Sequence, residues 1–304
     1  MDDFEHESYV KAGKATISAK KLARQIIKPG TKLIDATFLI ENEIKKRGAE
    51  LSFPVNISIN SLAAHYSPPI DDPKVFPAKG LVKIDVGAHV NGFVADAAFT
   101  INMGNEDGMM ENLVKAADDA LTNAINAIKP GVDVTDLGGI IENAIRKYPG
   151  IRPISNLGGH QLKRYDLHAG VFVPNIRGGG TSYKLKEGDV IAIEPFATNG
   201  LGVITSGKEI HIFAVLPNAK AKAKTKTDKD LIAKFIQKFS RFPFSPRWID
   251  FIAKSAIMNT INNYIKMKLI MGYPIFIETP TAMVAQSEHT VIVTKDGAEV
   301  TTLE

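Results

Sequence analysis

The protein has 304 residues, of which 44% are hydrophobic and 23% are charged, so the chain can bury a large core. Its formal net charge of +4 is too small to indicate a nucleic-acid partner by itself. The chain has no cysteine, which excludes disulfides and thiolate metal ligands and fits a cytoplasmic protein. The N-terminus is acidic and unlike a signal peptide, and no apolar run is long enough to cross a membrane. We therefore expect a cytoplasmic protein that does not enter membranes.

Helix signals recur in the two halves of the chain. Four helices are predicted, at residues 5–27, 32–47, 106–128 and 135–148. The first and third end at the same letters, Ile-Lys-Pro-Gly, which close at Gly30 and Gly131. An aspartate follows five residues after each glycine, at Asp35 and Asp136. Because these signals keep their order and spacing, they indicate a duplicated α/β unit.

A β-hairpin is predicted at residues 81–100, because two β-rich runs flank Asn91-Gly92, a strong turn signal. With that turn, Asp85 faces Ala98, and Asp96 lies diagonally across from Asp85 on the same face, roughly 7–8 Å away. Aspartate is uncommon in strands and is costly to bury without a partner. Two aspartates among apolar residues therefore indicate a bound cation. Two solvated or arginine-paired aspartates on an exposed face are the alternative.

The second half predicts a similar hairpin. Ile191-Ala192-Ile193-Glu194 precedes Asn199-Gly200, as the strand ending in Asp85 precedes Asn91-Gly92. The pattern therefore places Glu194 in the first strand of a second hairpin. Its counterpart to Asp96 is displaced by an insertion, and Glu288 is expected in that role because it directly precedes a β-rich run.

A histidine is the fifth candidate ligand. His160 follows the glycine-rich residues 156–159, and glycine lets the backbone approach a crowded site closely. Four carboxylates and one imidazole, with no sulfur, suit two hard or borderline divalent ions. A surface position at a strand end is the alternative for Glu194 and for Glu288.

An insertion interrupts the second half. A strand is predicted at residues 203–215, followed by a run that alternates lysine with small residues, from Lys220 to Lys226. Helical segments are predicted at 231–239 and 246–268. We interpret residues 217–272 as an inserted helical subdomain. The lysine run fits a solvated linker, and a nucleic-acid patch is the alternative.

Several motifs together resemble type II methionine aminopeptidase, in its short archaeal-like form. They are Ala63-Ala64-His65-Tyr66-Ser67-Pro68, the two hairpin aspartates, Gly159-His160, Leu167-His168-Ala169-Gly170, Ile193-Glu194-Pro195-Phe196 and Gln286-Ser287-Glu288-His289-Thr290. The resemblance runs from Tyr9 to the final strand and includes Phe242-Pro243-Phe244 and Arg247-Trp248 in the insertion. It implies a pita-bread α/β fold of two pseudo-symmetric halves. Residues 1–216 and 273–304 would form the catalytic domain, and 217–272 a helical, winged-helix-like subdomain.

The resemblance also implies a site with two divalent ions, which the sequence leaves open as Co, Mn, Fe, Ni or Zn. It assigns the metal ligands to Asp85, Asp96, His160, Glu194 and Glu288. Asp96 and Glu288 would bridge the ions, and Glu194 would also shuttle a proton. His65 and His168 would be non-ligand histidines that contact the substrate and donate hydrogen bonds to the oxyanion or to flanking peptide groups. The methionine pocket would include Phe53, Pro54, Asn56, Leu167 and Tyr273, although Phe53 and Leu167 also fit an ordinary core. Some relatives carry a polar residue in place of Gly158, so a contact made by that residue is in doubt here.

The implied function is removal of the initiator methionine from nascent polypeptide N-termini when the second residue is small, by a metal-activated water. A monomer is expected, with the ribosome as a possible docking partner. Two alternatives remain. Prolidase and aminopeptidase P use a similar fold after a sizeable N-terminal domain, whereas only 84 residues precede Asp85. Non-catalytic pita-bread proteins that bind RNA or protein partners have lost metal ligands, whereas all five are present here.

Overall fold

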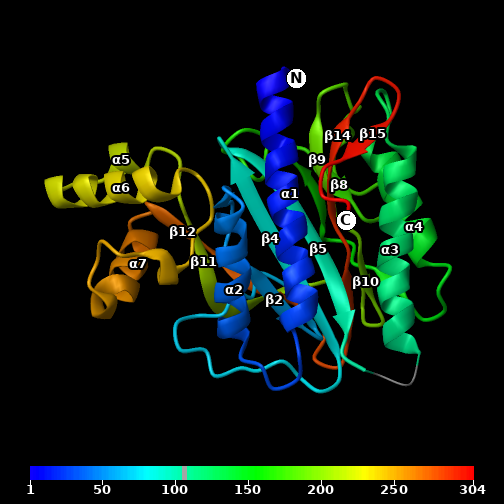
Figure 1. Ribbon diagram of the computed structural model, residues 1–304, viewed down its shortest axis with the longest axis horizontal. Coiled ribbons are helices and arrows are strands. Elements are labelled where there is room, and N and C mark those ends of the chain that lie inside the picture. The colour runs from blue at the N-terminus through cyan, green and yellow to red at the C-terminus, as the bar shows by residue number, and fades with distance from the viewer. Residues whose placement is uncertain (105–107) are drawn as a thin grey trace.

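The computed structural model describes residues 1–104 and 108–304. Figure 1 shows a body of helices packed on twisted sheets and a helical lobe that projects from one side of it. The first half of the body contains α1 (Asp3–Ile26), α2 (Leu33–Lys46), β1 (Glu50–Leu51), β2 (Asn56–Ile59), β3 (Leu62–Ala64), β4 (Leu81–Val90) and β5 (Phe93–Asn102). The second half begins with α3 (Met109–Ala127), α4 (Val134–Ile145), β6 (Arg152–Pro153), β7 (Gly158–Gln161), β8 (Phe172–Pro174), β9 (Val190–Ile193), β10 (Phe196–Thr198) and β11 (Thr205–Val215). The lobe contains α5 (Ala219–Lys222), α6 (Lys226–Phe239) and α7 (Ile257–Lys266), and the chain returns through β12 (Ile270–Ile277), β13 (Val284–Gln286), β14 (His289–Val293) and β15 (Ala298–Val300).

The four predicted helices are confirmed, with small shifts at their ends. Helix α1 begins two residues earlier than predicted because the Asp2 side chain accepts a hydrogen bond from the Glu5 amide at 2.8 Å and caps it. Helix α4 is capped in a similar way by Asp133, which accepts from the Thr135 amide. The predicted start of the third helix at Glu106 lies outside the described residues.

The two helix pairs are joined to the body by matching hydrogen bonds. The Gly30 amide donates to the Phe76 carbonyl at 3.0 Å, and the Gly131 amide donates to the Leu185 carbonyl at 2.7 Å. Both glycines have a left-handed backbone, with φ of 82° and 91°. The same turn, with the same type of partner, therefore occurs once in each half, which supports the predicted duplication.

The first hairpin has the predicted register. Strands β4 and β5 pair antiparallel, with Asp85 opposite Ala98 and Gly87 opposite Asp96. Asn91 and Gly92 form the turn with φ of 55° and 87°, both in the left-handed region that the tight hairpin turn requires. Both aspartates consequently lie on one face of the hairpin.

The predicted second hairpin is wrong in its connection. Strand β9 does not turn back at Asn199-Gly200; it pairs instead with β14, with Ile193 opposite His289. The next strand, β10, pairs with β13, with Phe196 opposite Gln286. The second ladder is therefore a counterpart of β4–β5 whose partner strand returns only after the lobe. Glu288 directly precedes β14, as predicted.

Each half has its own apolar core. Helices α1 and α2 pack on β4 and β5 over one cluster of buried residues, while α3 and α4 cover β9 and β14 over another (Figure 1). The two sheets meet along a seam between β5 and β14. In the described part of the chain, no helix has the length and apolar character needed to cross a membrane.

The lobe has its own apolar core, a third beside those of the two halves, and a β-ladder connects it to the body. Strands β11 and β12 pair antiparallel, with Val215 opposite Ile270, and the lobe lies between them. Strand β12 was not predicted, and it spans the predicted domain boundary at 272/273. The predicted helical segment 246–268 is divided into two short 3₁₀ turns and α7. The lobe core consists of residues from α5, α6, α7, the ladder and the loop after α6, among them Phe213, Ala219, Ile232, Phe235, Phe239, Phe244, Ile257, Ile261 and Tyr264.

Candidate metal centre

Five side chains from both halves converge at the seam. The first half supplies Asp85 on β4 and Asp96 on β5. The second half supplies the other three: Glu194 directly after β9, Glu288 directly before β14, and His160 on β7. His160 lies opposite Ala192 in the ladder between β7 and β9, which brings the imidazole beside the end of β9. The structure therefore brings together all five residues that were predicted as ligands.

The distances within the cluster suit a metal site. His160 Nε2 lies 3.5 Å from Glu194 Oε1 and 3.8 Å from Asp96 Oδ2. Asp96, His160 and Glu288 each offer one ligand atom, and these three atoms lie within 4.8 Å of one another. Gln286 Nε2 donates to Glu194 Oε2 at 3.4 Å and to Glu288 Oε2 at 3.5 Å. One amide thus supports the two glutamates on the second-half side of the site.

The carboxylates have little access to water and stand close to one another. Asp96 and Glu288 are only 3% and 2% exposed. Burial raises the pKa of Asp85 to about 7. Burial, together with the neighbouring carboxylates, raises the pKa of Asp96 and of Glu288 well above the usual range, and burial and Asp85 do the same for Glu194. Such a cluster of like charges needs positive charge at its centre.

The donor set fits a divalent metal. Within the described residues, Asp85 Oδ1, Asp96 Oδ1 and His160 Nδ1 are buried and have no hydrogen-bond partner. Buried polar atoms in native proteins almost always have one, so the two aspartate oxygens, which face the carboxylate cluster, suit a bound cation. Carboxylate oxygens and an imidazole nitrogen, with no sulfur, are the donors that hard and borderline divalent ions take.

The glycines before His160 are required by close packing. A Cβ atom on Gly159 would lie 2.1 Å from the Ala192 carbonyl oxygen, and one on Gly158 would lie 2.2 Å from that of Val173. The prediction that glycine lets the backbone approach closely is therefore confirmed for both. The structure also explains the departure at Gly158, because any side chain here would collide with the neighbouring strand.

Two threonines join the halves beside the ligands. Thr290 Oγ1 accepts from the Asp96 amide at 2.7 Å and donates to the Asp96 carbonyl at 2.8 Å. Thr100 Oγ1 makes the same pair of bonds with Gln286, accepting at 2.8 Å and donating at 2.7 Å. These cross-links fix β5 against β13 and β14. Sequence reasoning missed their role, since no local pattern marks a threonine that bonds a distant strand.

A buried lysine also supports the centre and was missed. Lys83, two residues before Asp85, is 1% exposed. Its Nζ donates to the Asn60 carbonyl at 3.0 Å and to the Val284 carbonyl at 2.8 Å. Burial lowers its pKa to about 7. The lysine thereby links the segment before His65 to β13, the strand before Glu288.

The cluster lies at one side of a cavity of about 370 Å³. All five ligand candidates line it, together with His65, His168, Phe53, Asn56, Leu167 and Tyr273. Pro54, predicted for the pocket, is not among the lining residues; its carbonyl accepts from Asn56 Nδ2 at 2.8 Å. The wall also contains residues that sequence reasoning did not assign to the pocket: Ala64, Leu157, Gly158, Phe172, Phe196, Ile212, Pro243 and Phe276. Pro243 shows that the lobe contributes to the cavity.

The two histidines of the cavity wall that are not ligand candidates, His65 and His168, are neutral at neutral pH. Burial lowers the pKa of His65 to about 4 and lowers that of His168. His65 Nδ1 lies 3.1 Å from the Pro274 carbonyl, so Nδ1 carries the proton and Nε2 is a hydrogen-bond acceptor. His65 is therefore suited to accept from a peptide N–H rather than to donate to an oxyanion. His168 packs against His160, with ring centroids 4.5 Å apart.

Two α/β halves with a carboxylate-and-imidazole centre at their seam define a metal-dependent hydrolase of the pita-bread class. The model of metallopeptidase family M24 matches residues 7–295. The methionine aminopeptidase of Thermococcus onnurineus is 41% identical over 302 residues, covering 98% of this chain and 99% of the relative. That of Methanocaldococcus jannaschii is 38% identical over 297 residues, covering 98% of each chain. The chain belongs to metallopeptidase family M24.

Solved structures agree on the fold. The methionine aminopeptidase of Thermotoga maritima superposes with a TM-score of 0.73 at 24% identity, covering 100% of this chain and 98% of that one. A structure of a thermophilic Arx1 superposes with a TM-score of 0.84 at 17% identity, covering 99% and 91%. At these identities the likeness concerns the fold alone, and it confirms the predicted pita-bread fold.

Proposed function

We propose that the protein is a metalloaminopeptidase that removes the initiator methionine from new polypeptides when the second residue is small. The observation that carries the proposal is the convergence of Asp85, Asp96, His160, Glu194 and Glu288 at the wall of one cavity. The full-length relatives, which are methionine aminopeptidases, support the same activity.

The five residues would hold two divalent ions. Such ions, when bound, supply Lewis acidity and lower the pKa of water. Their identity, among Co, Mn, Fe, Ni and Zn, is open because all of these accept carboxylate and imidazole donors.

The protein's own side chains bind the substrate and transfer the proton needed for hydrolysis. Phe53, Leu167 and Tyr273 give the cavity an apolar wall for an uncharged thioether side chain. His65 Nε2 accepts from a peptide N–H, and His168 contacts the same part of the substrate. Glu194, at the cavity wall, takes up the proton that the attacking water releases and delivers it to the leaving amine. The second residue of the substrate would lie near the ligands, which accords with the proposed preference for a small side chain.

A non-catalytic binding protein is less well supported, since all five ligand candidates are present and line one cavity. An Xaa-Pro peptidase is also less well supported, because the relatives that match over their full length are methionine aminopeptidases. Nascent chains would be the substrates. We expect the protein to act in the cytoplasm, consistent with the lack of cysteine, as a monomer that works near the ribosome.

Peptide cleavage tests the proposal. The enzyme, supplied separately with each candidate metal, is incubated with peptides that begin Met-Gly, Met-Ala, Met-Lys, Met-Arg and Ala-Pro, and the products are followed by mass spectrometry. Met-Gly and Met-Ala peptides should lose methionine, while Met-Lys and Met-Arg peptides should be nearly inert. Comparable cleavage of both sets, or preference for Xaa-Pro, would contradict the assignment.

A further inference from the structure

Positive charge is concentrated in the lobe. Residues 217–272 contain ten lysines, two arginines, three aspartates and no glutamate, a net charge of +9. The rest of the chain has 25 Lys and Arg against 30 Asp and Glu, a net charge of −5. The mild overall charge of +4 therefore conceals two regions of opposite sign. A separation of this size indicates a surface for a polyanion.

The lysines of the lobe face solvent and are mostly unpaired. All ten are exposed: Lys220, Lys222, Lys224, Lys226, Lys229, Lys234, Lys238, Lys254, Lys266 and Lys268. Among the described residues, only Lys238 has an ion-pair partner, Asp250. Asp228 is engaged by Thr225 and Tyr264 instead. Nine lysine ammonium groups are thus free to bind an external anion.

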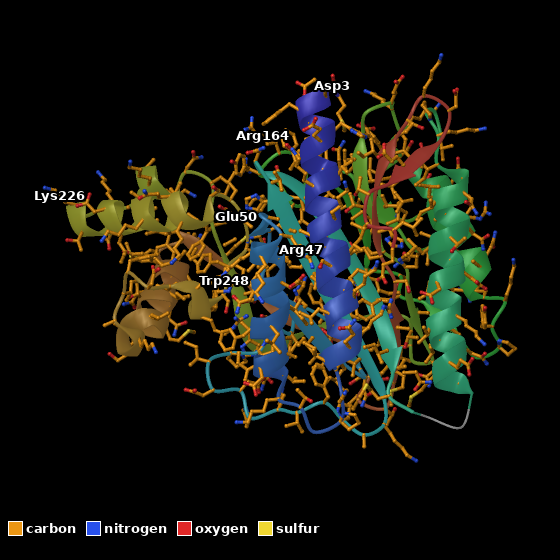
Figure 2. The ribbon with its side chains drawn as sticks, viewed as in Figure 1. Asp3, Arg47, Glu50, Arg164, Lys226 and Trp248 are labelled. Atoms are coloured by element: carbon orange, nitrogen blue, oxygen red, sulfur yellow. The ribbon has the colours of Figure 1, made fainter. Side chains whose placement is uncertain are left out.

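Five of these lysines gather where α5 and α6 meet. Lys220 and Lys222 lie on α5, Lys224 lies in the connection, and Lys226 and Lys229 begin α6. Figure 2 shows Lys226 at the far end of the lobe, pointing away from the body. Like charges so close together repel one another, and a bound polyanion would remove that repulsion.

We propose that this lobe, residues 217–272, binds the phosphate backbone of RNA. Exposed lysines spread along a surface suit repeated phosphates rather than one small anion. A membrane is a poorer fit because the apolar face of α6, with Ile232, Phe235 and Phe239, is turned into the lobe core. The choice of RNA rests on the proposed function, since a chain still being made is attached to an RNA-containing assembly.

The lobe is held in a fixed position on the body. Arg247 forms a bidentate ion pair with Glu41 of α2, at 3.0 and 2.8 Å, and both side chains are buried. Trp248 Nε1 donates to the same carboxylate at 2.9 Å, and Figure 2 shows this side chain between the lobe and α2. Phe242 stacks on His89 of β4, and Pro243 reaches the cavity wall. RNA on the lobe would therefore set the orientation of the cavity mouth toward an emerging chain.

Binding of the full-length protein to a fluorescein-labelled RNA hairpin, measured by anisotropy over a range of salt concentrations, tests the proposal. One variant carries Lys220→Gln, Lys222→Gln, Lys226→Gln and Lys229→Gln. The matched control carries Lys28→Gln, Lys79→Gln, Lys129→Gln and Lys147→Gln, four exposed lysines of the body. The lobe variant should bind at least tenfold more weakly, with a salt slope reduced by about 3, since each of the four lost phosphate contacts removes about 0.7–0.9. The control should bind within twofold of the unmodified protein.

Three outcomes would overturn the proposal: no RNA binding at physiological salt, equal loss in both variants, or tighter binding to phosphatidylserine vesicles than to RNA. Hydrolysis of a Met-Ala-Ser tripeptide is measured in parallel and should be unchanged in both variants. RNA binding without peptide hydrolysis in the unmodified protein would contradict the proposed function and leave the RNA surface intact. Peptide hydrolysis without RNA binding would contradict the RNA surface and leave the proposed function standing.

Discussion

The body and the lobe differ in where they place groups of like charge: the body gathers carboxylates at its seam, and the lobe exposes lysines to solvent. At the seam of the body, four carboxylates surround one imidazole, with Asp96 and Glu288 buried and Asp85 and Glu194 half-buried. On the lobe, ten lysines point into water. Burial without compensation costs several kcal/mol per charge, whereas an exposed charge remains solvated at little cost. The comparison teaches that a charge change in the seam should alter metal binding and stability, while the same change on the lobe should alter only what binds from outside.

The largest effect is expected at Glu288. Glu288→Gln replaces one carboxylate of the cluster with a neutral amide of the same shape, so, if the centre holds two ions as proposed, the second ion should bind more weakly. Activity should fall by at least about a hundredfold, the range expected for loss of metal support at such a site. Metal titration should fall from two ions toward one, with an unchanged circular dichroism spectrum. Glu187→Gln, an exposed position, is the control and should retain full activity. A Glu288→Gln enzyme that keeps both metals and normal turnover would show that Glu288 is not a ligand.

Lysine allows a direct comparison of the two regions. Lys83→Met removes the ammonium from two buried carbonyls and should lower the free energy of unfolding by about 1–3 kcal/mol. Peptide hydrolysis should also fall, because the segment before His65 and the strand before Glu288 lose their link. Lys226→Met, on the exposed lobe, should leave both quantities unchanged. Denaturant unfolding and tripeptide assays measure them, and equal effects of the two substitutions would contradict the comparison.

Metal removal should destabilise the body in a pH-dependent way. A carboxyl group whose pKa is raised by folding, such as Asp85 from 3.8 to about 7, favours the folded state most at low pH. That contribution is complete below the unfolded pKa and is lost as the pH rises toward 7. The melting temperature of the chelated protein should therefore fall between pH 4 and pH 7, and added metal should restore it most at the upper end. A melting temperature that rises over this range in the chelated protein would contradict the charge assignment.

The smallest effect is expected from the lobe. Neutralising Lys220, Lys222, Lys224 and Lys226 should leave kcat/KM on short peptides within about twofold, because these side chains are exposed and far from the ligands. Steady-state kinetics on a Met-Ala-Ser tripeptide measure this. A large loss would mean that the lysines act on the catalytic site.

Local signals predicted the parts of the centre that depend on nearby residues. Asn91-Gly92 and the β pattern around it were sufficient to place Asp85 and Asp96 on one face. The same turn signal at Asn199-Gly200 was misleading, because the partner of β9 comes after the lobe and tertiary pairing overrides a local turn. The role of Lys83 was not predictable, because nothing in the local sequence indicates that its ammonium group will donate to carbonyls of distant segments. Similarly, the proton on His65 is fixed by the Pro274 carbonyl, which is 209 residues away in the chain.

The threonine cross-links have a consequence for folding kinetics. Thr290 and Thr100 bond partners that lie 194 and 186 positions away in the sequence. The hairpin β4–β5 is a local structure and can form early, but contacts of such high order form slowly. The centre therefore becomes complete only when β13 and β14 dock against β5. During refolding, the rate of metal uptake would report this late docking step, separately from the earlier appearance of helices and the first hairpin.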